Sequence, residues 1–230
     1  MKTTIPHSKW LYPASIQEAM ESQKEMAKQI ILKDQLKKVP TLIAGMDVSN
    51  NLFDPTQRIF AATVVLSYPK LAILETVTTV EVQKFPYISG FLGFREAPAL
   101  IHTFEKLSLY PDLIMIDGNG INHPRGLGLA SHLGVLLGIP TIGVAKNILI
   151  GRPAATLSEE IGSKVPIIYK GKTIAMMLRT KKRTRPIIIS AGHFISLEMA
   201  VALVTNCIKG YKLPEPTRQA HLAANVCRTA

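Results

Sequence analysis

The segment that decides the fold is LIMIDGNGINHPRG, residues 113–126. Its apolar start, residues 113–116, indicates a buried strand that ends on the carboxylate of Asp117. Three glycines follow within ten residues and let the backbone approach a ligand closely. A carboxylate at the end of a strand, backed by such a loop, is typical of a metal or phosphate site. An ordinary Asp-Gly turn is the alternative, but the imidazole and guanidinium groups within residues 122–125 favour a functional site.

A second apolar strand, residues 42–49, carries Asp47 inside it. An unpaired carboxylate within a strand is costly unless a cation or hydrogen bonds compensate for its burial. Two such carboxylates on neighbouring strands would also repel each other. A hard divalent cation would remove both penalties, and it explains Asp47 and Asp117 together.

Composition limits the function classes. The chain has 230 residues, 47% of them hydrophobic, which suits one domain with a sizeable core. Its net charge of +11 predicts a polyanionic partner, above all nucleic acid, although a merely solubilising charge is the alternative. The two cysteines fit no zinc or disulfide pattern. Neither a signal peptide nor a membrane-spanning stretch is visible, so we expect a cytoplasmic protein without membrane contact.

The order of predicted elements gives the fold class. A helix at residues 15–38 lies within an N-terminal helical extension, residues 1–40, that packs on a single domain. Three closely linked strands (42–49, 58–67 and 73–84) predict an antiparallel meander. Helices and strands then alternate, which predicts parallel strands with helices across the faces: helix 96–107, strand 113–117, helix 127–137 and strand 141–145. A β-region (166–178 and 187–190) and helices at 197–208 and 215–227 complete a ribonuclease H-like mixed sheet flanked by helices.

Further candidate groups lie at the ends of predicted elements. Residues 85–96 begin with an apolar, aromatic loop and end on a third carboxylate, Glu96. On a basic protein, such a rigid tip can enter a base stack. The alternative is that its aromatic side chains fold back onto the core. Lys146 and His193 each end a strand, where a surface lysine and a core histidine are the alternatives. The basic run 181–185 either grips phosphates or is simply solvated.

The segments around Asp47 and at 85–96, 116–128, 143–147 and 190–197 resemble the motifs of the endonuclease V family. The resemblance covers about residues 42–224 and keeps the family's order and spacing. It implies a ribonuclease H-like fold and Mg²⁺, with Mn²⁺ as a substitute, held by Asp47, Glu96 and Asp117. Lys146 and His193 would complete the catalytic set. The resemblance also implies a strand-separating wedge at Pro86, Tyr87, Ile88 and Ser89. Phosphate contacts are expected from Arg95 and Lys146. The implied lesion pocket comprises Gly90, Leu92, Gly118, Asn119, Gly120, Ile121, His123 and Gly128.

The implied activity is hydrolysis of the second phosphodiester bond 3′ to deoxyinosine, giving 3′-hydroxyl and 5′-phosphate ends, in DNA repair by a monomer. An endoribonuclease acting on inosine in RNA is one alternative, and a protein that binds altered bases without cutting is another. Two positions depart from the family's usual pattern. Asn119 stands where histidine is common, and Phe194 stands where a basic residue is common.

Overall fold

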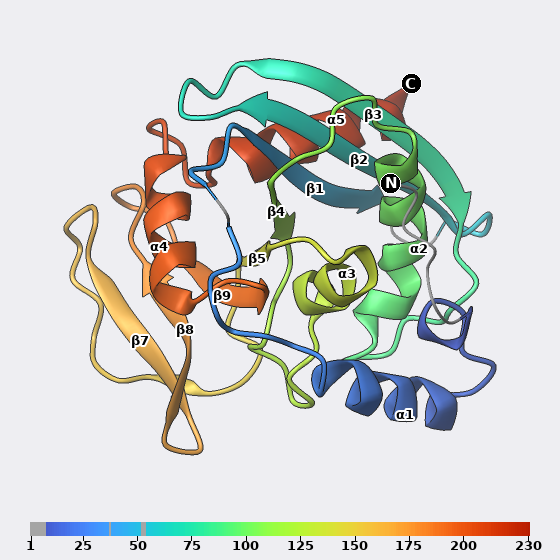
Figure 1. Ribbon diagram of the computed structural model, residues 1–230, viewed down its shortest axis with the longest axis horizontal. Helices are drawn as coiled ribbons and strands as arrows, with labels where there is room; N and C mark the ends of the chain where they lie inside the picture. Colours follow the sequence, from blue (N-terminus) through green and yellow to red (C-terminus); the bar gives the residue numbers. More distant parts are fainter. Residues whose placement is uncertain (1–7, 37, 52–53) are drawn as a thin grey trace.

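The computed structural model describes residues 8–36, 38–51 and 54–230. One sheet of nine strands runs through it in the order β3-β2-β1-β4-β5-β9-β8-β7-β6 (Figure 1). The strands are β1 (Leu42–Asn50), β2 (Arg58–Ser67), β3 (Ile73–Val82), β4 (Leu113–Asp117), β5 (Thr141–Ala145), β6 (Arg152–Pro153), β7 (Lys164–Tyr169), β8 (Lys172–Leu178) and β9 (Ile187–His193). The helices are η1 (Ser8–Trp10), α1 (Ile16–Ala27), α2 (Leu92–Glu105), α3 (Leu129–Leu137), α4 (Leu197–Asn206) and α5 (Glu215–Thr229).

Strand directions confirm the predicted mixed sheet. β1, β2 and β3 form the antiparallel meander. β1, β4 and β5 are parallel, so their C-terminal ends lie at one edge. Because the predicted catalytic residues Asp117 and Lys146 lie there, we call it the catalytic edge. β9 pairs antiparallel with β5, and β8, β7 and β6 extend the sheet further.

Helices cover both faces of the central strands. Met46 and Ile116 point into an apolar cluster shared with α1, α2 and α3. Ile43 and Met115 point into the opposite cluster, shared with α4 and α5. Because side chains alternate along a strand, Asp47 and Asp117 belong to the face that α5 covers. Figure 1 shows α5 crossing behind β1 and β2, on the side away from α3.

Several boundaries differ from those predicted. The predicted N-cap Ser15 is confirmed, since its hydroxyl accepts from Glu18 N, but α1 ends at Ala27 rather than near residue 38. Beyond it the backbone pairs instead with Phe194, whose N donates to Ile31 O at 2.7 Å. Helix α2 begins at Leu92, four residues early, and contains Pro98. No helix among the described residues is both long and apolar enough to cross a membrane.

Candidate active site

Asp47 and Asp117 are neighbours because of strand register. Met46 of β1 pairs in parallel with Ile116 of β4, so the residue that follows each lies at the catalytic edge. Asp47 is 7% exposed and Asp117 is half-buried. Burial, followed by the charge of Asp47, raises the pKa of the Asp117 carboxyl. The structure therefore brings these two predicted carboxylates together.

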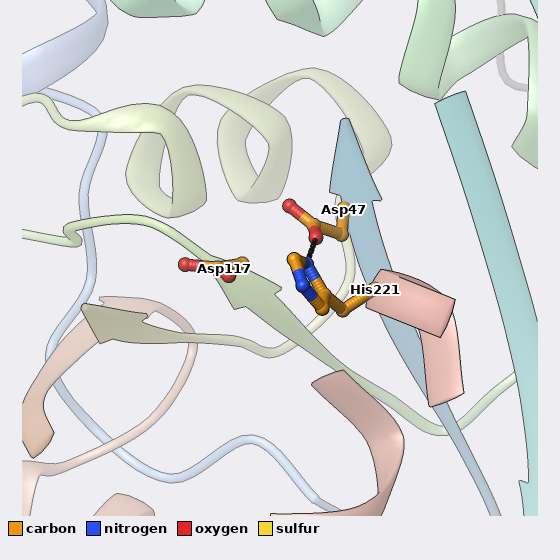
Figure 2. A group of neighbouring side chains, drawn as sticks. All are labelled: Asp47, Asp117 and His221. Atoms are coloured by element: carbon orange, nitrogen blue, oxygen red, sulfur yellow. Dashed lines mark hydrogen bonds and ion pairs between the residues drawn. The ribbon is translucent and has the colours of Figure 1, made fainter. Parts of the chain in front are cut away.

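Helix α5 adds a third group, His221, which was not among the residues predicted from the sequence. Its Nδ1 lies 2.7 Å from Asp47 Oδ2 (Figure 2), and this hydrogen bond raises the pKa of His221. The helix can dock this closely because β1 has a glycine where the two backbones meet. A Cβ on Gly45 would lie 1.8 Å from Pro216 O. The next turn of α5 then carries His221 to the carboxylates.

Asp47, Asp117 and His221 form a candidate metal centre. Each offers one ligand atom, and these atoms all lie within 4.8 Å of one another. Figure 2 shows the three side chains converging from β1, β4 and α5. Carboxylate oxygens with one imidazole nitrogen form a donor set for a divalent cation.

Glu96 approaches the centre from α2. It does not belong to the group of three, yet it is electrostatically close to them. Burial, then the charges of Asp47 and Asp117, raise its pKa to about 8. Without a cation, the folded protein therefore keeps this carboxyl protonated at neutral pH.

Two basic side chains lie beside the acidic groups. Lys146, directly after β5, places Nζ 2.6 Å from Asp117 Oδ2. Burial opposes its charge, but Asp117 holds the pKa of Lys146 above its ordinary value. Arg95, the residue before Glu96, places its guanidinium 5.2 Å from the centre of the Tyr87 ring.

The structure does not bring His193 to this site. β9 runs antiparallel to β5, so His193 pairs with Thr141 at the start of β5, away from Lys146. Four residues of strand separate those ends, or about 13 Å. Its Nδ1 accepts from Ile31 N at 3.3 Å, and burial lowers the pKa of the ring.

Tyr87 lies apart from the other aromatic residues of the segment 85–96. The rings of Phe85, Phe91 and Phe94 pack on one another in the core, with centroids 5.6–6.4 Å apart. Tyr87 is 77% exposed and projects from the loop between β3 and α2. The expectation that the aromatics fold inward therefore describes the phenylalanines and not Tyr87.

A cavity of about 170 Å³ lies between that loop and the residues after β4. Of the expected pocket residues, six line it: Gly90, Leu92, Gly118, Asn119, His123 and Gly128. Gln23 from α1 also lines it. Gly120 instead packs against β9, where a Cβ would lie 2.1 Å from Ala191 O. Ile121 lines a different cavity, next to α4.

Comparisons with known proteins agree on one family. The family model described as endonuclease V matches residues 24–222. A protein of that name from Protochlamydia amoebophila is 54% identical over 219 residues, covering 95% of this chain and 93% of that protein. Endonuclease V from Streptomyces avermitilis has a similar crystal structure, with a TM-score of 0.86, 36% identity and coverage of 98% and 95%. The Ciona intestinalis enzyme, solved with a 24mer DNA containing an inosine followed by a ribo-adenosine, gives a TM-score of 0.80 at 29% identity, covering 93% and 98%.

Proposed function

The chain belongs to the endonuclease V family, a nuclease family, and from this we propose that it cuts DNA next to deoxyinosine. The proposed reaction is metal-dependent hydrolysis of the second phosphodiester bond 3′ to the lesion, leaving 3′-hydroxyl and 5′-phosphate ends. Its biological role would be repair of deaminated adenine. The observation that carries the proposal is the cluster of Asp47, Asp117 and His221.

The residues present fit a divalent cation. Three carboxyl groups share one edge of the sheet, and burial followed by their mutual repulsion raises the pKa values of Glu96 and Asp117. Asp47 and Asp117 would hold Mg²⁺, with Glu96 as a further oxygen ligand. Carboxylate oxygens suit Mn²⁺ as well as Mg²⁺, so Mn²⁺ would substitute in the same site. When bound, the ion supplies charge neutralisation at the phosphate and a lowered pKa for water.

Lys146 gives the site a fixed positive charge. Its ion pair with Asp117 keeps Nζ at the catalytic edge. From there the ammonium group can hold a phosphate oxygen or orient the attacking water. His193 lies at the far end of β5 and has no part in this mechanism.

The cavity and Tyr87 support recognition of an extruded base. A volume of about 170 Å³ is smaller than typical ligand pockets, so it suits one base rather than a whole nucleotide. The exposed Tyr87 ring beside it would fill the gap that the base leaves. Base recognition and metal chemistry thus occupy adjoining places, which fits a cut displaced from the lesion.

A cleavage assay on matched inosine-containing DNA and RNA strands tests the proposal. We expect Mg²⁺-dependent cutting of the DNA at the second 3′ phosphodiester bond, and no cutting in EDTA. Cleavage of RNA alone would favour the endoribonuclease. Binding of inosine without cleavage in Mg²⁺ or in Mn²⁺ would favour a protein that binds altered bases without cutting. The acidic cluster argues against such a protein.

A further inference from the structure

The loop that carries Tyr87 is anchored at one oxygen atom. We call residues 86–90 the wedge loop, and its last residue, Gly90, has φ of +80°. The Gly90 carbonyl oxygen accepts from Gln23 Nε2 at 2.9 Å, His123 Nε2 at 3.0 Å and Arg125 Nη2 at 2.7 Å. A carbonyl oxygen has two lone pairs, so three donors saturate it. Tyr87 and Ser89 are exposed, which leaves this oxygen as the loop's main polar anchor.

Gln23 differs from the other two donors because it comes from α1, in the N-terminal extension. It is 1% exposed. Its Nε2 is used by Gly90, and its Oε1 accepts a hydrogen bond from Arg125 Nε. Both ends of the amide are therefore committed to protein groups, although Gln23 lines the cavity. Such a side chain can hold the pocket in shape, because both of its polar atoms are hydrogen-bonded to protein groups.

We propose that Gln23 is a positioning residue that fixes the wedge loop against the base cavity, which makes α1 part of the recognition apparatus. The inference rests on the proposed function. A loop already held in its working position loses less conformational entropy on binding than a free one. Separation of a duplex should depend on this anchor more than binding of a single strand.

Gln23→Leu tests the anchor, because leucine has a similar size and no hydrogen-bonding group. Loss of the hydrogen bond to Gly90 predicts about a fivefold lower kcat/KM on inosine duplex, through KM, and less than about a twofold loss on single strands. Leucine also removes the acceptor of Arg125 Nε, which a glutamate would keep. Gln23→Glu should show the same loss, since a carboxylate can accept from Arg125 but cannot donate to Gly90.

Ser22→Ala is the matched control. Ser22 is a buried neighbour on α1, and its hydroxyl donates to Lys9 O rather than to the wedge loop. It should keep the wild-type ratio of duplex to single-strand cleavage at a similar melting temperature. Equal ratios in Gln23→Leu, Gln23→Glu and wild type would overturn the proposal.

Hydrogen exchange gives a readout that needs no activity. The amide of Phe91, which donates to Ile88 O at 3.0 Å and closes the wedge loop, should exchange at least about tenfold faster in Gln23→Leu than in wild type or Ser22→Ala. Unchanged exchange would overturn the anchor. Absence of inosine cleavage by the wild type, with faster exchange in Gln23→Leu, would refute the proposed function and leave the anchor standing.

An independent observation concerns two basic loops, residues 181–185 and 209–212, which we call the basic surface. Lys181, Lys182 and Lys209 are exposed on it. The loops are docked together, since Thr180 Oγ1 donates to Lys212 O at 2.7 Å. Arg179, 8% exposed, holds the first loop by donating to Thr184 O at 2.6 Å. The loops that carry these charges are therefore held in place by hydrogen bonds.

The basic surface lies at the catalytic edge. Ala145 pairs with Ile188, and the next β9 residue outward, Ile187, pairs with Leu178 of β8. The loop between β8 and β9 thus projects beyond the level of Lys146. Three strand spacings separate β4 from β8, or about 14 Å. We infer that this surface binds backbone phosphates of the DNA flanking the lesion, without reading sequence.

The salt dependence of DNA binding tests this surface. In the double variant Lys181→Gln with Lys182→Gln, the slope of log Kd against log salt should fall by about one to two. The double variant Lys70→Gln with Lys106→Gln removes equal charge from exposed positions at the opposite edge and should leave the slope unchanged. Equal slopes in both variants would overturn the inference. DNA lacking inosine gives the same readout, so the result stands apart from cleavage.

Discussion

Replacement of Glu96 by glutamine should stabilise the metal-free protein while abolishing its proposed cleavage activity. Glutamine is neutral and close in shape to the protonated carboxyl that the folded protein holds. In the wild type, burial and the two aspartates raise the pKa of Glu96 from 4.5 to about 8. Between these values the folded protein binds more protons than the unfolded chain, so stability falls as pH rises. Glu96→Gln removes that fall.

The size of the effect follows from the pKa values. At about 1.4 kcal/mol per pH unit, keeping Glu96 protonated at pH 7 lowers the unfolding free energy by about 3 kcal/mol. At pH 5 the same calculation gives less than about 1 kcal/mol. Glu96→Gln should therefore exceed the wild type by about 3 kcal/mol at pH 7 and hardly at all at pH 5. Mg²⁺ should narrow the gap, since a cation favours the charged carboxylate.

Urea unfolding at pH 5 and pH 7, in EDTA and in Mg²⁺, measures these differences. Glu105→Gln is the matched control, because Glu105 is exposed in the last turn of the same helix. It should give the wild-type pH dependence. A gap between wild type and Glu96→Gln that is equal at both pH values would refute the placement of Glu96 in a buried acidic cluster.

Other variants test separate parts of the structure. Asp117→Ala should abolish cleavage and leave inosine binding largely intact, so normal cleavage with Mg²⁺ present would refute the metal site. Tyr87→Ala should weaken cleavage of duplex more than of single strands, and an equal loss would argue against a wedge. The wild type should lose stability as the pH falls from 6.5 to 4, because burial lowers the pKa of His132 to about 4. His132→Gln should remove this loss. Urea unfolding should show the loss as about 2 kcal/mol at pH 5. Gly120→Val should melt at a much lower temperature rather than change base selectivity, since its side chain would enter the β9 backbone.

The paired aspartates could be predicted because both end apolar runs of the type that forms central parallel strands. The direction in which each strand runs through the sheet was harder to predict. His193 also ends an apolar run, but its strand is antiparallel to β5, which places the imidazole at the wrong edge. Strand polarity depends on the route of the intervening chain, and local sequence does not record it.

His221 was missed for a different reason. It is one histidine in an amphipathic helix, and its partner Asp47 is 174 residues away. The available signal was Gly45, because a glycine inside a strand often marks the close approach of another backbone. That glycine could have indicated a helix docked against β1, although not which side chain the helix would bring.

The proposed metal ligands on β1 and β4 belong to strands with neighbours on either side and apolar clusters on both faces. Backbone in such positions opens only with global unfolding, whereas exposed loops open locally at little cost in free energy. Warming should therefore impair lesion recognition before it disturbs the geometry of the metal centre. The wedge loop carries none of the proposed metal ligands, so a substitution there should alter lesion recognition and leave the metal centre in place.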